Sequence, residues 1–302
     1  QVSKQGFVYL LDRRPGQPIW EIVERPVPRS KVPGEHSSPT QPFPTRPAAF
    51  DRQGLSRDDL IDFTPQLRQE AVEIVRQFDS DGLYTPPSER GAVLLPSILG
   101  GASWSGAALD RESGWLYVPS ITAPFIFRLA RPEPGTSDMR FLAQRFGLDG
   151  PDGLPITKPP YGRITAIDLN TGNHQWAVAL GSGPRHHARL KALNLPPLGW
   201  PSRGFVLATK TLLFAVQEPD ETSFLSPATN TRDTTAITRE PRLWVLDKRS
   251  GRTVSETELP ANAGGAPMTY SLQSRQFIVV PVGGGGLPAE LVALALESTE
   301  DR

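Results

Sequence analysis

The 302-residue sequence contains no cysteine, which excludes disulfide bonds, thiolate metal sites and cysteine nucleophiles. It also has no excess of either charge, because 32 Lys and Arg residues balance 32 Asp and Glu residues. Without a broad basic surface, nucleic acid is not expected as a partner. No run approaches the roughly 18 apolar residues that a transmembrane helix needs. These absences leave the pattern of strands and turns as the informative part of the sequence.

The first residues lack the charged and apolar regions of a signal peptide, and no initiator methionine is present. A strong strand follows within a few residues of Gln1. We therefore expect the chain to be the middle of something longer, with any export signal upstream.

Four segments share the spacing Asp-x3-Gly. They are Asp12 to Gly16, Asp110 to Gly114, Asp168 to Gly172 and Asp247 to Gly251. In each copy an apolar, β-rich run reaches the Asp and a new strand follows the glycine, which predicts a hairpin with φ > 0 at glycine. Trp20 and Trp176 follow two of these turns, and we expect both to pack between repeats. Repetition of one unit at this spacing predicts a β-propeller or another β-array.

One helix interrupts the predicted strands. Residues 25–90 form an insertion whose first part is rich in proline and therefore unsuited to a helix interior or a central strand. Thr64 can cap a helix that starts at Pro65, and apolar residues at helical spacing predict that it runs over 65–78. Ser56 and Asp59 resemble a capping box. From Gly91 onward short strands resume, with irregular stretches at 132–160 and 218–240. At about 40 to 45 residues per blade, the chain holds about four blades.

Several segments resemble the pyrroloquinoline quinone (PQQ)-dependent glucose dehydrogenase family of quinoprotein dehydrogenases, in the same order and spacing. They are residues 1–47, YTPPSERG (84–91), GGASWSGAALDRESGWLYVPS (100–120), PYGRITAIDLNTGNHQW (160–176) and APMTYSLQSRQFIVVPVGGG (266–285). The resemblance implies an all-β fold, about four blades of an eight-bladed propeller with one inserted helix, in which tryptophan-docking hairpins end the blades. Residues 1–302 are then a partial propeller domain, the C-terminal half of the ring.

The same resemblance implies a quinone cofactor, PQQ, near the propeller axis beside a calcium ion. The reaction is oxidation of an aldose or alcohol, in which a hydride leaves while a carboxylate takes the hydroxyl proton. Lys4 sits where the family places a lysine that contacts the quinone oxygens, and its ammonium would stabilise the negative charge of the reduced quinone. Ser120 stands where some relatives carry an asparagine near the cofactor, and Trp104 lies in a segment that faces the central channel. Lys4, Trp104 and Ser120 are thus the expected cofactor-binding residues.

The resemblance places the catalytic base upstream of residue 1 and most calcium ligands in the other half of the ring. No metal ligand is therefore assigned in this chain, and we expect it to be inactive alone. Ubiquinone or a cytochrome would accept the electrons, and the protein would be periplasmic, associated with the inner membrane only through an upstream anchor.

Three departures from the family pattern favour a different interpretation, a non-catalytic propeller that serves as a scaffold or binding module. Trp200 interrupts a usual Gly-Gly-Pro, Ser255 stands where a docking tryptophan is expected, and residues 282–285 lack the histidine of an AGGHG-like stretch. A third interpretation is a self-contained small propeller of unknown ligand.

Two further patterns predict surface structure. His186 and His187 are adjacent, so their side chains point in different directions, and no carboxylate lies at ligand spacing; we expect a surface loop. The glycine run 283–286 lacks the Lys-Ser/Thr and the helix that a phosphate-binding loop requires, and is expected to be a turn.

Overall fold

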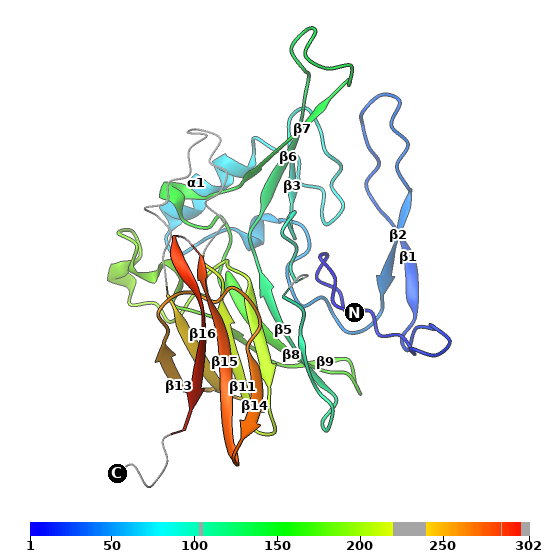
Figure 1. Ribbon diagram of the computed structural model, residues 1–302. Helices are drawn as coiled ribbons and strands as arrows, with labels where there is room; N and C mark the ends of the chain where they lie inside the picture. The colour runs from blue at the N-terminus through cyan, green and yellow to red at the C-terminus, as the bar shows by residue number, and fades with distance from the viewer. Residues whose placement is uncertain (103–104, 220–239, 285, 297–302) are drawn as a thin grey trace.

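The computed structural model describes residues 1–102, 105–219, 240–284 and 286–296. These residues form one α-helix and sixteen strands, which pair antiparallel in five sheets (Figure 1). Within them, no helix combines the length and apolar character that crossing a bilayer requires. The predicted dominance of β-structure with one helix is confirmed.

Two four-stranded sheets and one three-stranded sheet stand side by side in the structure (Figure 1). The first contains β4 (Ala108–Asp110), β5 (Trp115–Ile121), β8 (Gly162–Asp168) and β9 (Asn173–Ala179). The second contains β10 (Gly204–Ala208), β11 (Leu212–Gln217), β12 (Arg242–Asp247) and β13 (Thr253–Glu258). The third contains β14 (Met268–Leu272), β15 (Arg275–Gly284) and β16 (Leu287–Ala295). Each sheet pairs its strands in chain order, as propeller blades do.

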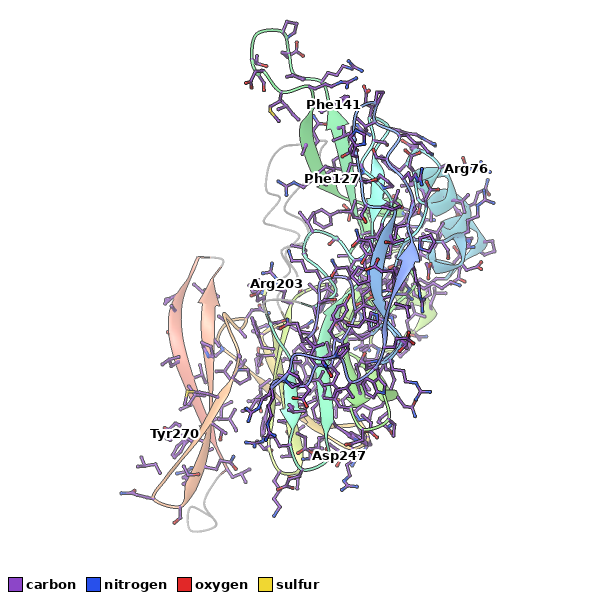
Figure 2. The ribbon with its side chains drawn as sticks, turned by 90° about the vertical axis from the view of Figure 1, so that its right-hand side faces the viewer. Arg76, Phe127, Phe141, Arg203, Asp247 and Tyr270 are labelled. Atoms are coloured by element: carbon purple, nitrogen blue, oxygen red, sulfur yellow. The ribbon has the colours of Figure 1, made fainter. Side chains whose placement is uncertain are left out.

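The sheets pack face to face through both faces of the second one. Because side chains alternate along a strand, Leu213 and Ala215 of β11 join a buried cluster with the first sheet, whereas Val216 joins a cluster with the third. In β12, Trp244 belongs to the cluster with the first sheet and Leu243 to the cluster with the third. Figure 2 shows the third sheet, which carries Tyr270, at one side of the stack. A sheet buried on both faces is what stacking of repeated units produces.

The Asp-x3-Gly segments form four turns of one geometry, as predicted. In each turn the glycine N–H donates to the carbonyl oxygen of the Asp at 2.7 to 2.9 Å, and the glycine φ lies between +71° and +75°. The Asp carboxylate accepts the N–H two residues later, at 2.8 to 3.2 Å. The side chain thus closes an Asx-turn while glycine supplies the left-handed conformation.

Both predicted tryptophans lie against the glycine of a later turn. Trp176 Nε1 donates to the carbonyl oxygen of Lys248 at 3.2 Å, and a Cβ placed on Gly251 would lie 2.8 Å from the Trp176 ring. A Cβ on Gly172 would lie 3.4 Å from Trp20. Only glycine allows the Trp176 ring to approach this closely.

A buried ion pair also joins the turns of the first two sheets. Lys248 Nζ lies 2.6 Å from Asp110 Oδ2, and the two side chains are 9% and 8% exposed. Burial acts to raise the pKa of Asp110, but hydrogen bonds from Lys248, Ser113 and the Glu112 N–H outweigh it and lower this pKa to about 2. Asp110 is therefore fully ionised at neutral pH.

The helix α1 (Pro65–Val75) begins where expected and ends three residues early. The N–H of Leu67 donates to Thr64 Oγ1 at 3.2 Å, as the capping prediction requires. Beyond Arg76, Gln77 and Phe78 donate to residues three positions back, so the last turn tightens and the helix stops. Ser56 N–H donates to the Asp59 carboxylate, which confirms that capping box at the short 3₁₀ helix Arg57–Asp59.

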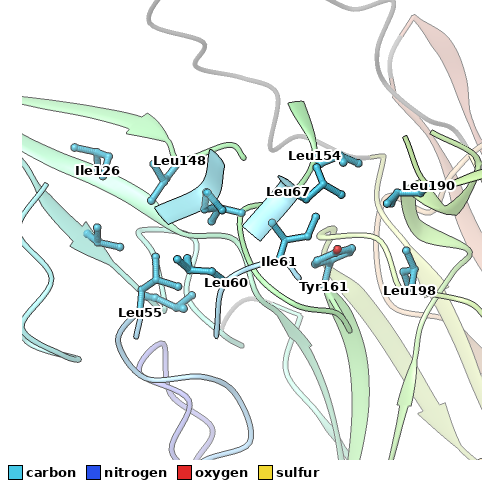
Figure 3. Close-up of a cluster of buried hydrophobic side chains, with 14 residues drawn as sticks. Leu55, Leu60, Ile61, Leu67, Ile126, Leu148, Leu154, Tyr161, Leu190 and Leu198 are labelled. Carbon is cyan, nitrogen blue, oxygen red and sulfur yellow. The ribbon is translucent and has the colours of Figure 1, made fainter. Parts of the chain in front are cut away.

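The helix packs into a large hydrophobic cluster (Figure 3). The cluster combines Leu67 and Ala71 of α1 with Leu60, Ile61 and Tyr161. Three further 3₁₀ helices are formed by Pro151–Gly153, Gly183–His186 and Lys191–Leu193.

Two segments expected to be irregular contain strands. In the proline-rich stretch, β1 (Ile22–Pro26) pairs with β2 (Thr40–Pro44), and proline is accommodated because both are edge strands of a two-stranded sheet. A separate sheet has β6 (Phe125–Ala130) between β3 (Ala92–Leu94) and β7 (Leu142–Gly147), which lies in the segment 132–160. The expected excursion at 218–240 falls mostly outside the described residues. Gly283, Gly284 and Gly286 have positive φ where β15 turns into β16, as expected for a turn.

Candidate functional site

Lys4 lies in a tight turn formed by residues 3–7, which we call the Lys4 turn. Ser3 N–H donates to the carbonyl oxygen of Phe7 at 2.9 Å, and Phe7 N–H donates to Ser3 Oγ at 3.2 Å. The side chain of Lys4 is exposed, and its Nζ donates to the carbonyl oxygen of Ile98 at 2.8 Å. An ammonium has three N–H donors, so this single described bond leaves Lys4 able to donate to an anionic ligand.

Two glycines connect the Lys4 turn to β5. A Cβ on Gly100, whose φ is +83°, would lie 2.6 Å from Lys4 Cγ, so glycine is required for this contact. Gly101 N–H donates to the carbonyl oxygen of Lys4, and Ile121 N–H donates to that of Gly101, both at 2.8 Å. Lys4 is therefore two backbone hydrogen bonds from the end of β5, where Ser120 lies.

Ser120 is 3% exposed, and its Oγ has no hydrogen-bond partner among the described residues. It pairs with Arg163 of β8 in the sheet register, so the two side chains share one face. A buried hydroxyl without a partner costs free energy unless water or a ligand satisfies it. Trp104, the third expected cofactor residue, lies outside the described residues.

A buried polar network next to these residues was not found from the sequence. Thr122 Oγ1 donates to Asp51 Oδ1 at 2.6 Å, and Arg163 Nη2 lies 3.2 Å from the same oxygen. Arg163 also donates to Thr122 Oγ1 and to the carbonyl oxygen of Pro160. The Asp51 side chain is 0% exposed and that of Arg163 is 13% exposed. The only local sign of this network in the sequence was Arg163, a charged residue at the start of the apolar run that forms β8.

Several atoms around this network are buried without a partner among the described residues. They are Asp51 Oδ2, Arg52 Nη1, Arg163 Nε and the hydroxyl of Tyr161. Burial lowers the pKa of the Arg163 guanidinium, an effect that the Asp51 carboxylate opposes. Burial likewise raises the pKa of Tyr161, which keeps its hydroxyl neutral and able to donate. Such groups are commonly satisfied by ordered internal water.

Thr122 also lines a cavity of about 540 Å³. Its wall includes Phe125, Asp149, Ser182, His187 and Trp200. The indole N–H of Trp200 donates to Glu240 Oε2 at 2.7 Å, and the same oxygen accepts from Ser182 N–H and Oγ. This volume falls within the range of small-molecule pockets.

The histidines predicted to lie in a surface loop contribute to the same cavity. His186 is exposed and His187 is half-buried. Among the residues that the structure describes, no three His, Asp or Glu side chains gather as a metal site would require. The calcium ion therefore remains a prediction.

The comparison with known families identifies one over most of the chain. The sequence model of the PQQ glucose/ethanol/alcohol dehydrogenase β-propeller domain matches residues 1–278. Quinoprotein glucose dehydrogenase A of Acinetobacter calcoaceticus is 26% identical, in an alignment covering 94% of this chain and 36% of that protein. Quinate/shikimate dehydrogenase (quinone) of Acinetobacter baylyi is also 26% identical, covering 98% of this chain and 38% of that protein. The chain spans little more than a third of the length of these relatives.

A solved structure supports the fold. A europium-containing methanol dehydrogenase superposes with a TM-score of 0.50 and 15% identity, covering 93% of this chain and 36% of that one. At this identity the likeness concerns the fold alone. Together with the family match, it confirms the predicted quinoprotein-type β-propeller.

Proposed function

The chain belongs to the PQQ-dependent glucose/ethanol/alcohol dehydrogenase family of β-propeller domains, and on this premise we propose that its protein oxidises an aldose or alcohol with PQQ. The family match over residues 1–278 is the observation that carries the proposal. Electrons would pass to ubiquinone or a cytochrome, and the reaction would take place in the periplasm.

The residues present fit one side of a quinone site. Lys4 offers an ammonium that makes only one described hydrogen bond, and Ser120 offers a hydroxyl without a described partner. Bound PQQ would supply the oxidant that takes two electrons from the substrate. The role of Lys4 is then to hold a positive charge beside the quinone oxygens, where negative charge develops. Ser120 would hydrogen-bond near the same site, directly or through an ordered water.

Other parts of the proposed site are not assigned to described residues. We infer that Trp104 contacts the cofactor from the segment that follows Gly101, and that the catalytic base and most calcium ligands lie outside this sequence. These 302 residues alone should therefore not turn over substrate. The packing of Trp176 on Gly251 supports our interpretation of the repeats as tryptophan-docking hairpins.

A non-catalytic propeller is the second candidate. Ser255 lies on β13, where the repeat would place a docking tryptophan, and Trp200 replaces a glycine and lines the 540 Å³ cavity. A binding module would use that cavity without needing the charge of Lys4.

Substitution of Lys4 tests the proposal. In the complete gene product, loaded with PQQ and calcium, we expect Lys4→Ala to lower dye-linked oxidation of aldoses or alcohols by about 100-fold, the scale of removing one charge-stabilising donor. Lys210→Ala is the matched control, because Lys210 is an exposed lysine in the turn between β10 and β11. The backbone of this turn hydrogen-bonds to the Asp247–Gly251 turn, at the end of the sheets opposite to Lys4. It should retain activity.

The two candidates give different results. Absence of any PQQ-dependent dye reduction by the wild-type product, with no retained cofactor, would overturn the dehydrogenase proposal. Equal activity in Lys4→Ala and Lys210→Ala would remove Lys4 from the site.

A further inference from the structure

We propose that Asp51, paired with Arg163, is a positioning residue that holds the Lys4 turn against the end of β5. The inference rests on the proposed function, since Lys4 matters only if it meets the quinone. The Asp51 side chain is fully buried, so its effect must pass through the residues around it.

On one side, Asp51 packs against the two glycines that flank Lys4 in space. Its Cβ lies 3.6 Å from a Cβ placed on Gly6 and 3.4 Å from one placed on Gly101. Backbone and side-chain bonds fix the same junction. Phe50 N–H donates to the carbonyl oxygen of Gly6 at 2.9 Å, and Gln53 Nε2 donates to that of Gln5 at 2.7 Å. The segment around Asp51 therefore forms the support on which the Lys4 turn rests.

On the other side, the carboxylate of Asp51 is bound to the first sheet. Its Oδ1 accepts from Thr122 Oγ1 at 2.6 Å and lies 3.2 Å from Arg163 Nη2. The N–H of Arg52 also donates to it, at 2.7 Å. Because the Asp51 side chain is not exposed to bulk solvent, these charge-assisted bonds are stronger than they would be on the surface. Asp51 thus links the Lys4 turn to the strand pair that carries Ser120.

The contacts of Asp51 with Thr122 and Arg163 connect the Lys4 turn to the strands around Ser120 through side chains. Within the part of the chain that the structure describes, a backbone route runs through Gly101, and glycine has no side chain to fix its neighbours. If the charge of Asp51 is removed, Arg163 loses its carboxylate and is free to turn toward the unpartnered Ser120 hydroxyl beside it. Both sides of the proposed quinone site would then shift relative to each other.

The buried pair Asp110 and Lys248 supplies a matched control. It also joins a buried carboxylate to a cation, and its side chains are similarly buried. The Asp110–Lys248 pair lies next to the start of β5, whereas Asp51 contacts Thr122, just after the end of β5. If Asp51 only stabilises the fold, Asp51→Asn and Asp110→Asn should behave alike. If it positions Lys4, only Asp51→Asn should change cofactor binding.

The experiment titrates PQQ into the calcium-loaded complete gene product, freed of cofactor, and follows the quinone absorbance and its reduction potential. We expect Asp51→Asn to weaken PQQ binding by about 10-fold, the lower end of effects seen when supporting hydrogen bonds are removed. The reduction potential of bound PQQ should fall, because the Lys4 charge is held less closely. Asp110→Asn should change neither quantity in protein that is still folded. Thr122→Val, which removes one donor to Asp51 and keeps both charges, should give a smaller change in the same direction and serves if Asp51→Asn does not fold.

The outcomes separate this inference from the function on which it rests. If Lys4→Ala lowers PQQ affinity and potential while Asp51→Asn and Thr122→Val match Asp110→Asn, the positioning role is wrong and the dehydrogenase proposal stands. If Lys4→Ala changes neither affinity nor potential, the quinone site is wrong and the positioning role is overturned with it.

Discussion

Replacing Asp110 by Asn should remove a pH-dependent part of the stability of the stacked sheets. Asp110 is the last residue of β4, directly before the turn into β5, and its carboxylate is held by Lys248 Nζ at 2.6 Å and by Ser113 Oγ at 2.6 Å. The Lys248 side chain is 9% exposed, and its Nζ also donates to the carbonyl oxygen of Thr209 at 3.2 Å. The substitution keeps the shape of the side chain and removes its charge, so Lys248 stays buried without a counter-ion.

The magnitude follows from the pKa of Asp110, which falls from 3.8 to about 2 on folding. A pKa lowered this far on folding corresponds to roughly 2 kcal/mol of stability at neutral pH. Because the folded pKa is the lower one, this contribution is complete above about pH 5 and is lost as the pH falls toward 2. Leaving Lys248 unpaired raises the expected cost of Asp110→Asn to about 3 kcal/mol at pH 7.

Urea unfolding of the complete gene product, followed by tryptophan fluorescence at several pH values, measures this difference. The gap between wild type and Asp110→Asn should narrow between about pH 4 and pH 2. The double variant Asp110→Asn/Lys248→Met should recover part of the loss, because it removes the unpaired ammonium. The reasoning would be refuted if the difference in unfolding free energy between wild type and Asp110→Asn stayed constant from pH 7 to pH 2. It would also be refuted if the double variant were destabilised by the sum of the two single changes.

Two further predictions concern the turns and the helix. Gly16→Ala should lower the free energy of unfolding by about 1 to 2 kcal/mol, because Gly16 has φ +72°, which alanine adopts only with strain. No steric clash adds to this cost, since nothing lies within 4 Å of an added Cβ. Gly251→Ala should cost at least about 1 kcal/mol more, since its Cβ would meet the Trp176 ring at 2.8 Å; equal losses in urea unfolding would contradict the Trp176 contact. Thr64→Ala should destabilise by about 1 kcal/mol through loss of the bond to Leu67 N–H, and Thr64→Ser should not. If the α1 amides were protected from hydrogen exchange equally in Thr64→Ala and in wild type, this result would argue against a stabilising role of the Thr64 cap.

The sequence predicted best what is decided within a few residues. The four turns were predictable because the Asp carboxylate, the N–H two residues later and the glycine φ all belong to one short segment. The start of α1 was predictable for the same reason, since Thr64 and Pro65 act locally. Its end was placed too late because Phe78 continues the apolar stripe and packs near the helix, although the backbone has already tightened after Val75.

Other features depend on residues far apart in the chain. The strands β1 and β2 lie in a proline-rich stretch, and only their place at a sheet edge makes them possible. The Asp51 network joins residues 71 and 112 positions apart, so no spacing in the sequence could indicate it. The resemblance pointed to Lys4 and Ser120 but carried no information on what supports them.

Two parts of this domain therefore differ in how freely they can change. The Asp12 to Gly16 turn is closed by its own backbone and carboxylate, and nothing lies within 4 Å of a Cβ added at Gly16, so this loop can change without disturbing another segment. At the Lys4 end, Gly6, Asp51, Gly101 and Arg163 come from segments that must move together, and altering one requires compensating for the rest. Directed evolution of this domain would thus accept insertions or fusion partners at the Asp12 to Gly16 turn. New substrate specificity would need libraries that vary several distant positions at once.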